Sequence, residues 1–116
     1  VQDTVDAFIA TLVSDAGLGE VVNFGSNFEI SIADVVRLIA EKMNAKVDIT
    51  SDIERIRPEN SEVERLWADN SKVKELFGWS PKYAGRDGLA RGLQETINWF
   101  TQSENLQHYK SDIYNL

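Results

Sequence analysis

Cysteine is absent from this sequence of 116 residues, and histidine occurs only once, at position 108. The absence of cysteine excludes disulfide bonds and thiolate metal sites. A lone histidine in a polar tail also leaves no second ligand for a zinc site and no Ser/His/Asp catalytic set. The sequence has neither an apolar run of membrane-spanning length nor a secretory signal peptide. We therefore expect a cytoplasmic protein, without a membrane partner and without a bound metal.

Basic residues are scarce as well. Twelve lysines and arginines stand against 19 acidic residues, which gives a formal net charge of −7. Because a phosphate backbone needs a basic surface, we do not expect a nucleic-acid partner. Any anion must be held locally, by a few arginines. A glycine-rich dinucleotide fingerprint and a Tyr-x-x-x-Lys pair are also missing, so we expect neither a cofactor site nor catalytic residues in this chain.

Length and composition are those of one small globular domain. The chain is 42% hydrophobic and 27% charged, which is typical of folded domains. It begins at Val1 rather than at a methionine, and a helical pattern starts almost at once. We therefore expect a piece of a longer protein. Residues 1–103 are assigned to the domain and residues 104–116 to a polar C-terminal tail.

Four helices are predicted from apolar residues at helical spacing, starting near positions 3, 31, 70 and 87. Asp3 is the expected cap of the first helix. Ser31 and Asp34 form a capping box for the second, Gly78 ends the third, and the fourth runs to about residue 103. The first helix carries an apolar stripe that we expect to be buried: Val5, Phe8, Ile9, Leu12 and Val13.

Two or three short strands are predicted between the helices. Residues 21–25 form an apolar run bounded by turn residues, and residues 46–50 alternate with Val47 and Ile49 inward. Residues 66–68 form a third short extended piece. These elements predict a mixed α+β protein of the α/β class, whose thin sheet would be more stable against a larger domain. Trp79 and Trp99 are expected in the core.

Residues 51–64 have no clear period and contain the main candidate binding residues. Pro58 favours an extended backbone at Arg57, and a fixed guanidinium suits a phosphate or diphosphate through forked hydrogen bonds. The Glu62 carboxylate could accept hydrogen bonds from ribose hydroxyls. The alternatives are a surface ion pair of Arg57 with a nearby carboxylate and a solvated Glu62 on a loop. Arg65 is expected to be a surface ion-pair partner.

Two further features leave alternatives open. Asn23 and Gly25 follow the first expected strand, where α/β proteins often place ligand contacts. The same positions could instead form a turn that uses Gly25 and Asn27 for backbone reasons. Trp67 could line a cleft.

Several segments, taken in order, resemble the C-terminal third of the extended short-chain dehydrogenase/reductases that act on nucleotide sugars. These are the NAD-dependent epimerases and 4,6-dehydratases. The resemblance covers nearly the whole chain up to about residue 102. The segments are Val1-Gln2-Asp3-Thr4-Val5, Val22-Asn23-Phe24-Gly25-Ser26, Ile30-Ser31-Ile32, Arg57-Pro58, Asp69-Asn70-Ser71-Lys72, Phe77-Gly78-Trp79-Ser80-Pro81, Gly88-Leu89 and Thr96-Ile97-Asn98-Trp99-Phe100.

The resemblance implies a substrate-binding subdomain that packs on an N-terminal Rossmann domain absent here. That domain would hold NAD and the catalytic Tyr-x-x-x-Lys pair, and the parent enzyme would be a homodimer acting on a UDP- or GDP-linked hexose. Arg57 would bind the nucleotide diphosphate, and Glu62, or its competitor Glu59, would hold the ribose. The Arg-Pro-x-x-Ser-Glu-Val variant resembles N-acetylglucosamine-nucleotide 4,6-dehydratases of legionaminic-type sugar synthesis. The alternative is a non-catalytic interaction module that retains the scaffold.

Overall fold

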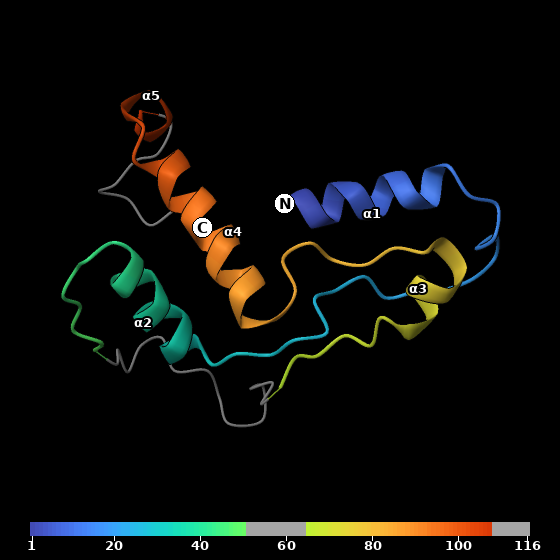
Figure 1. Cartoon of the computed structure of the whole chain (residues 1–116), viewed down its shortest axis with the longest axis horizontal. Coiled ribbons are helices and arrows are strands. Elements are labelled where there is room, and N and C mark those ends of the chain that lie inside the picture. Colours follow the sequence, from blue (N-terminus) through green and yellow to red (C-terminus); the bar gives the residue numbers. More distant parts are fainter. Residues whose placement is uncertain (51–64, 108–116) are drawn as a thin grey trace.

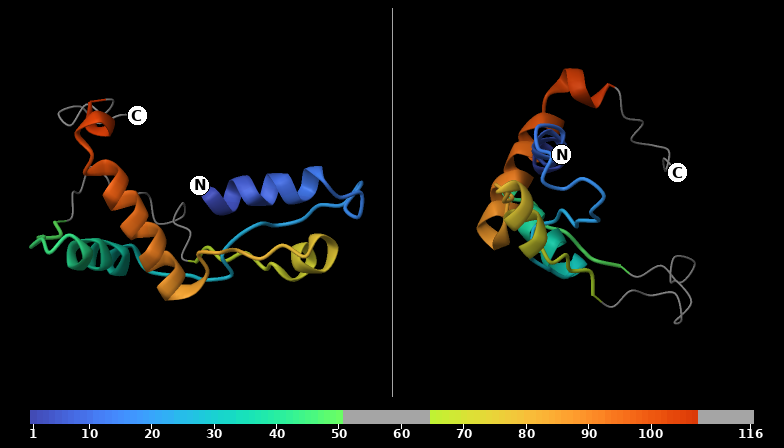
Figure 2. Two further views of the ribbon diagram at one scale, coloured as in Figure 1. Left: turned by 45° about the horizontal axis from the view of Figure 1, so that its top comes forward. Right: turned by 90° about the vertical axis from the view of Figure 1, so that its right-hand side faces the viewer.

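Three extended segments run side by side through the middle of the molecule, with helices at both ends (Figure 1). The computed structural model describes residues 1–50 and 65–107, and both views of Figure 2 are consistent with this layout. The extended segments are residues 21–31, 65–70 and 78–84. The helices are α1 (Gln2–Leu12), α2 (Ile32–Lys42), α3 (Ser71–Phe77), α4 (Gly85–Phe100) and α5 (Ser103–Leu106).

The helix boundaries follow local signals in the sequence. The capping box of α2 is confirmed, because Ser31 Oγ accepts a hydrogen bond from the Asp34 N–H at 3.1 Å and donates one to Asp34 Oδ2 at 2.7 Å. The predicted end of α3 is confirmed as well, since Gly78 adopts a left-handed φ of 62° and donates its N–H to Lys74 O. Helix α4 begins two residues earlier and ends three residues earlier than expected.

The core lies between α1 and α3. It contains the buried side chains of Ala7, Val73 and Trp79, and partly buried apolar residues pack around them: Ala10, Val22, Phe24 and Phe77. The ring of Phe24 meets Trp79 edge-on, with 5.2 Å between the ring centroids. The prediction for Trp79 is therefore confirmed. The prediction for Trp99 is wrong, because this side chain is 43% exposed.

The expected α/β class, with two or three short strands, is wrong for the part of the chain that the structure describes. Residues 21–25, 46–50 and 66–68 form no strand there. A strand requires backbone hydrogen bonds to a neighbour, and residues 21–30 make no such bonds to the 65–70 segment within the described residues. Val47 and Ile49, expected to point inward, are exposed. The described elements are therefore helices joined by extended segments.

The stripe on α1 is also not buried, contrary to expectation. Its members are all exposed: Val5, Phe8, Ile9, Leu12 and Val13. The helix instead turns Ala7 and Ala10 toward the core, and these two small residues lie on the opposite side at 100° per residue. Within the described ranges, no helix has the length and apolar character needed to cross a membrane.

Candidate functional site

The predicted binding residues lie outside the described residues. Arg57, Glu62 and the competitor Glu59 all fall in the range 51–64. The structure describes the segment that follows this range, residues 65–70, together with its neighbours. Contacts with residues 25–29 fix residues 65–70.

Side chains pair the 65–70 segment with residues 25–29 in an antiparallel register. Arg65 Nε donates to Glu29 Oε2 at 2.9 Å, and the second fork of the guanidinium donates to Glu29 Oε1. The indole N–H of Trp67 donates to Asn27 Oδ1. Residue numbers increase along one segment and decrease along the other, so the two segments are antiparallel. These bonds fix the position and direction of residues 65–70.

Asn70 and Gly25 form a buried contact between the two segments. Asn70 is almost fully buried, and its Nδ2 donates to the Gly25 carbonyl at 2.7 Å. A Cβ atom at Gly25 would lie only 2.6 Å from the Ala68 Cβ, so the backbones approach too closely for a side chain there. Asn27 adopts a φ of 49°. These backbone features agree with the turn interpretation of residues 23–27.

The Arg65–Glu29 ion pair is exposed to solvent. Hydrogen bonding to the Arg65 guanidinium lowers the pKa of Glu29, and the same contact raises the pKa of Arg65. Each group therefore favours the charged state of the other. The prediction that Arg65 is a surface ion-pair partner is confirmed. Trp67 is exposed and held by Asn27.

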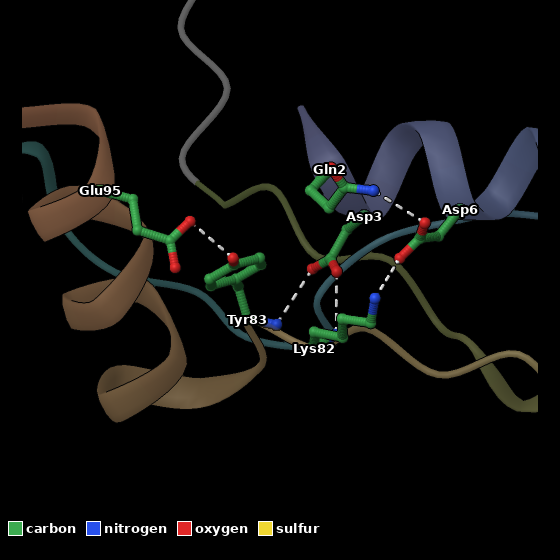
Figure 3. A network of polar contacts seen from close by, with 6 residues as sticks. All are labelled: Gln2, Asp3, Asp6, Lys82, Tyr83 and Glu95. Atoms are coloured by element: carbon green, nitrogen blue, oxygen red, sulfur yellow. Dashed lines mark hydrogen bonds and ion pairs between the residues drawn. The ribbon is translucent and has the colours of Figure 1, made fainter. Parts of the chain in front are cut away.

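A second polar network joins α1 to α4 through the 78–84 segment (Figure 3). The Asp3 carboxylate accepts from the backbone N–H groups of Lys82 and Tyr83 at 2.9 and 3.1 Å. Lys82 Nζ lies 2.8 Å from Asp6 Oδ2, and the Tyr83 hydroxyl donates to Glu95 Oε2 at 2.7 Å. Asp3 thus binds distant backbone amides, and α1 has no side-chain cap at its start, contrary to the cap assignment.

Protonation in this network follows its hydrogen bonds. Bonding to Lys82 lowers the pKa of Asp6 and raises that of Lys82. The bond to Glu95 raises the pKa of Tyr83, because a phenolate beside a carboxylate would be repelled. These groups bind one another and thereby join α1, the 78–84 segment and α4. Sequence reasoning missed the network, since 79 positions separate Asp3 from Lys82 and no local pattern connects them.

Two hollows flank the paired segments. One, of about 370 Å³, lies between α1, residues 24–26 and Trp79. The other, of about 750 Å³, borders Arg65 and also contains Arg86 from the first turn of α4. Arg65 is occupied by Glu29. Besides the hydrogen bond from Ser31, the charge of Arg86 helps to lower the pKa of Asp34, which borders the same hollow. Arg86 is therefore a second cation beside the candidate site, and the sequence analysis did not single it out.

The chain is similar in sequence to 4,6-dehydratases. The sequence profile of GDP-mannose 4,6 dehydratase matches residues 1–92 of this chain. The dTDP-D-glucose 4,6-dehydratases of Homo sapiens and Bos taurus are each 29% identical over 118 aligned positions, which cover 94% of the chain. The chain spans only 30% and 29% of the lengths of these relatives. No solved structure gives a significant match.

Proposed function

The chain belongs to the GDP-mannose 4,6 dehydratase family, and we propose that it is the substrate-binding part of a longer NAD-dependent nucleotide-sugar 4,6-dehydratase or epimerase. In this proposal the chain binds the nucleotide diphosphate of the substrate and carries no catalytic residues. NAD and the catalytic residues belong to an N-terminal Rossmann domain of the same protein. The parent protein is cytoplasmic and homodimeric.

One observation carries the proposal: the family match spans residues 1–92, a range that includes Arg57 and Glu62. The contacts next to residues 51–64 support it. Arg65, Trp67 and Asn70 fix the segment that follows residues 51–64. Anchoring a remote diphosphate would let binding energy position the reacting carbon of the hexose.

The substrate is a nucleotide-linked hexose. The names of the family and of the two relatives point to GDP- and dTDP-linked sugars, and a UDP-linked sugar is the third candidate. In the narrower proposal the sugar is an N-acetylglucosamine derivative of legionaminic-type synthesis, because of the variant that begins at Arg57-Pro58 and ends at Glu62-Val63. Glu62, or else Glu59, accepts hydrogen bonds from the ribose hydroxyls.

Replacing Arg57 in the complete gene product tests this role. Arg57→Ala removes a bidentate partner of the diphosphate, so substrate affinity should fall about tenfold or more, while NAD affinity stays nearly unchanged. Isothermal titration with nucleotide sugar and, separately, with NAD measures both affinities. Arg37→Ala is the matched control, because Arg37 is an exposed arginine that pairs with Asp34 of its own helix. Substrate affinity within twofold of wild type would contradict the role of Arg57.

Titration of the 116-residue chain with UDP, GDP and dTDP, followed by NMR, locates the nucleotide on this chain. We expect weak binding, with shifts confined to residues 51–64, to the 65–70 segment that follows them and to residues 25–29, which pair with that segment. Shifts elsewhere would contradict the proposed site. A coding sequence without an upstream dinucleotide-binding domain would instead favour a non-catalytic interaction module.

A further inference from the structure

Helix α1 presents two opposite apolar faces, and only one of them is covered within the described chain. Ala7 and Ala10 face the core. The opposite face carries the α1 stripe, which is exposed. Its members are Val5, Phe8, Ile9, Leu12 and Val13. Such a helix, with apolar side chains on both sides, is typical of an element packed between two layers rather than of a surface helix.

The orientation of α1 is fixed, so the stripe cannot turn inward. Asp3 binds two backbone amides of the 78–84 segment, and Asp6 pairs with Lys82. Figure 3 shows both carboxylates pointing from α1 toward that segment. Rotating the stripe toward the core would break these contacts and would force bulky side chains into the space now filled by Ala7.

The cavity of about 370 Å³ lies along the flank of the same helix. Phe8, a member of the stripe, forms part of its wall together with Phe24 and Trp79. The exposed stripe and this cavity therefore make one continuous apolar surface with a ridge and a hollow. A complementary surface would place an aliphatic or aromatic side chain in the hollow and would carry no charge opposite Ile9 or Leu12.

The relatives that match 94% of this chain are more than three times as long. Their extra length is sufficient for a whole domain, and a domain of that kind would cover the stripe.

We propose that the α1 stripe and the adjoining cavity form the docking surface for the additional domain that accounts for the rest of the relatives' length. This inference rests on the proposed function only in taking the chain as part of a longer protein. The occupant is an apolar face of that domain, which places a projecting side chain between Phe8 and Trp79. A second copy of the chain is an alternative occupant, which the experiment below distinguishes.

Paired charge substitutions test this assignment. Ile9→Lys places a charge in the stripe, and Ile49→Lys is the matched control, because the two isoleucines are 53% and 58% exposed. In the isolated chain neither substitution should move the melting temperature by more than about 2 °C. In the complete gene product Ile9→Lys should lower it by roughly 5 °C or more, since the charge becomes buried, while Ile49→Lys should not.

Several outcomes would overturn the assignment. One is an equal effect of both substitutions in the complete product, and another is a large effect of Ile9→Lys in the isolated chain. A third is a stable dimer of the isolated chain that Ile9→Lys dissociates, measured by light scattering, because the occupant would then be a second copy. An Arg57→Ala variant with normal substrate affinity would overturn the proposed function while leaving the docking result intact.

Discussion

The two ends of the molecule are packed in different ways. At the α1–α3 end Val73 is fully buried, and the ring of Trp79 fills the centre against Phe24 and Phe77. At the α2–α4 end the buried residues of these two helices are Leu38, Ala40 and Gly88, and an apolar groove of about 630 Å³ runs beside α2, α4 and α5. Trp79 is buried at the first end, whereas the rings of Trp99 and Phe100 at the second end are 43% and 37% exposed. The α1–α3 end should therefore contribute most of the stability of the chain.

Replacing one tryptophan at each end should give the largest difference. Trp79→Ala removes a side chain that is 8% exposed and should cost about 3–5 kcal/mol of unfolding free energy. Trp99→Ala removes one that is 43% exposed and should cost less than half as much. Urea unfolding followed by circular dichroism measures both losses. Equal losses would mean that the two ends are packed alike.

The junction between the ends can be tested at two glycines of α4. A Cβ at Gly88 would lie 2.3 Å from the Tyr83 carbonyl carbon, so Gly88→Ala must move backbone and should cost about 1–3 kcal/mol. At Gly92 the nearest atom is Tyr83 Cδ1 at 3.3 Å, and this side chain can shift. Gly92→Ala should be neutral or stabilising by up to about 1 kcal/mol, through helix propensity.

Urea unfolding of the two glycine variants distinguishes a rigid junction from a loose one. Opposite signs of the two changes would confirm that Tyr83 fixes α4 through its backbone. A neutral Gly88→Ala would contradict the close packing of the Tyr83 backbone against α4.

The smallest effect is expected from acid, through the ion pair that ties α1 to the junction. The folded-state pKa of Asp6 is lowered, chiefly by its hydrogen bond with Lys82. Its contribution to stability is therefore present above about pH 4, the ordinary value for this group, and is lost as the pH falls through the lowered pKa. The melting temperatures of wild type and Asp6→Asn should differ slightly at pH 6 and converge near pH 2.

Asp15→Asn serves as the control for this pH series, because the Asp15 carboxylate makes no ion pair within the described residues. Its melting curve should follow wild type at every pH. A gap between wild type and Asp6→Asn that persists at low pH would contradict an ionic origin.

The helices could be predicted from sequence because their signals are local. The capping box at Ser31 and Asp34 and the glycine at position 78 each act within one helical turn. The strands could not, because pairing depends on a neighbour that a local pattern does not identify. The pattern of α1 likewise showed an apolar face at Ile9 and Leu12 without showing what covers it.

The candidate site was predictable only in part. Arg65 was assigned as a surface ion-pair partner from its type and surroundings, but its partner Glu29 lies 36 positions away. Arg86 was not predicted as a site residue, because its place in the same hollow as Arg65 depends on how α4 is positioned. The roles of Arg57 and Glu62 stay predictions, which substrate titration can test.

The close approach at Gly25 has a consequence for sequence variation. A methyl group there would overlap the Ala68 methyl. The space between the two backbones therefore accommodates one methyl group and not two. Alanine at position 25 becomes acceptable only together with glycine at position 68, so natural variants should exchange the two residues as a compensating pair. Such a swap would keep the register of the segment that follows residues 51–64, whereas either enlargement alone would push that segment away.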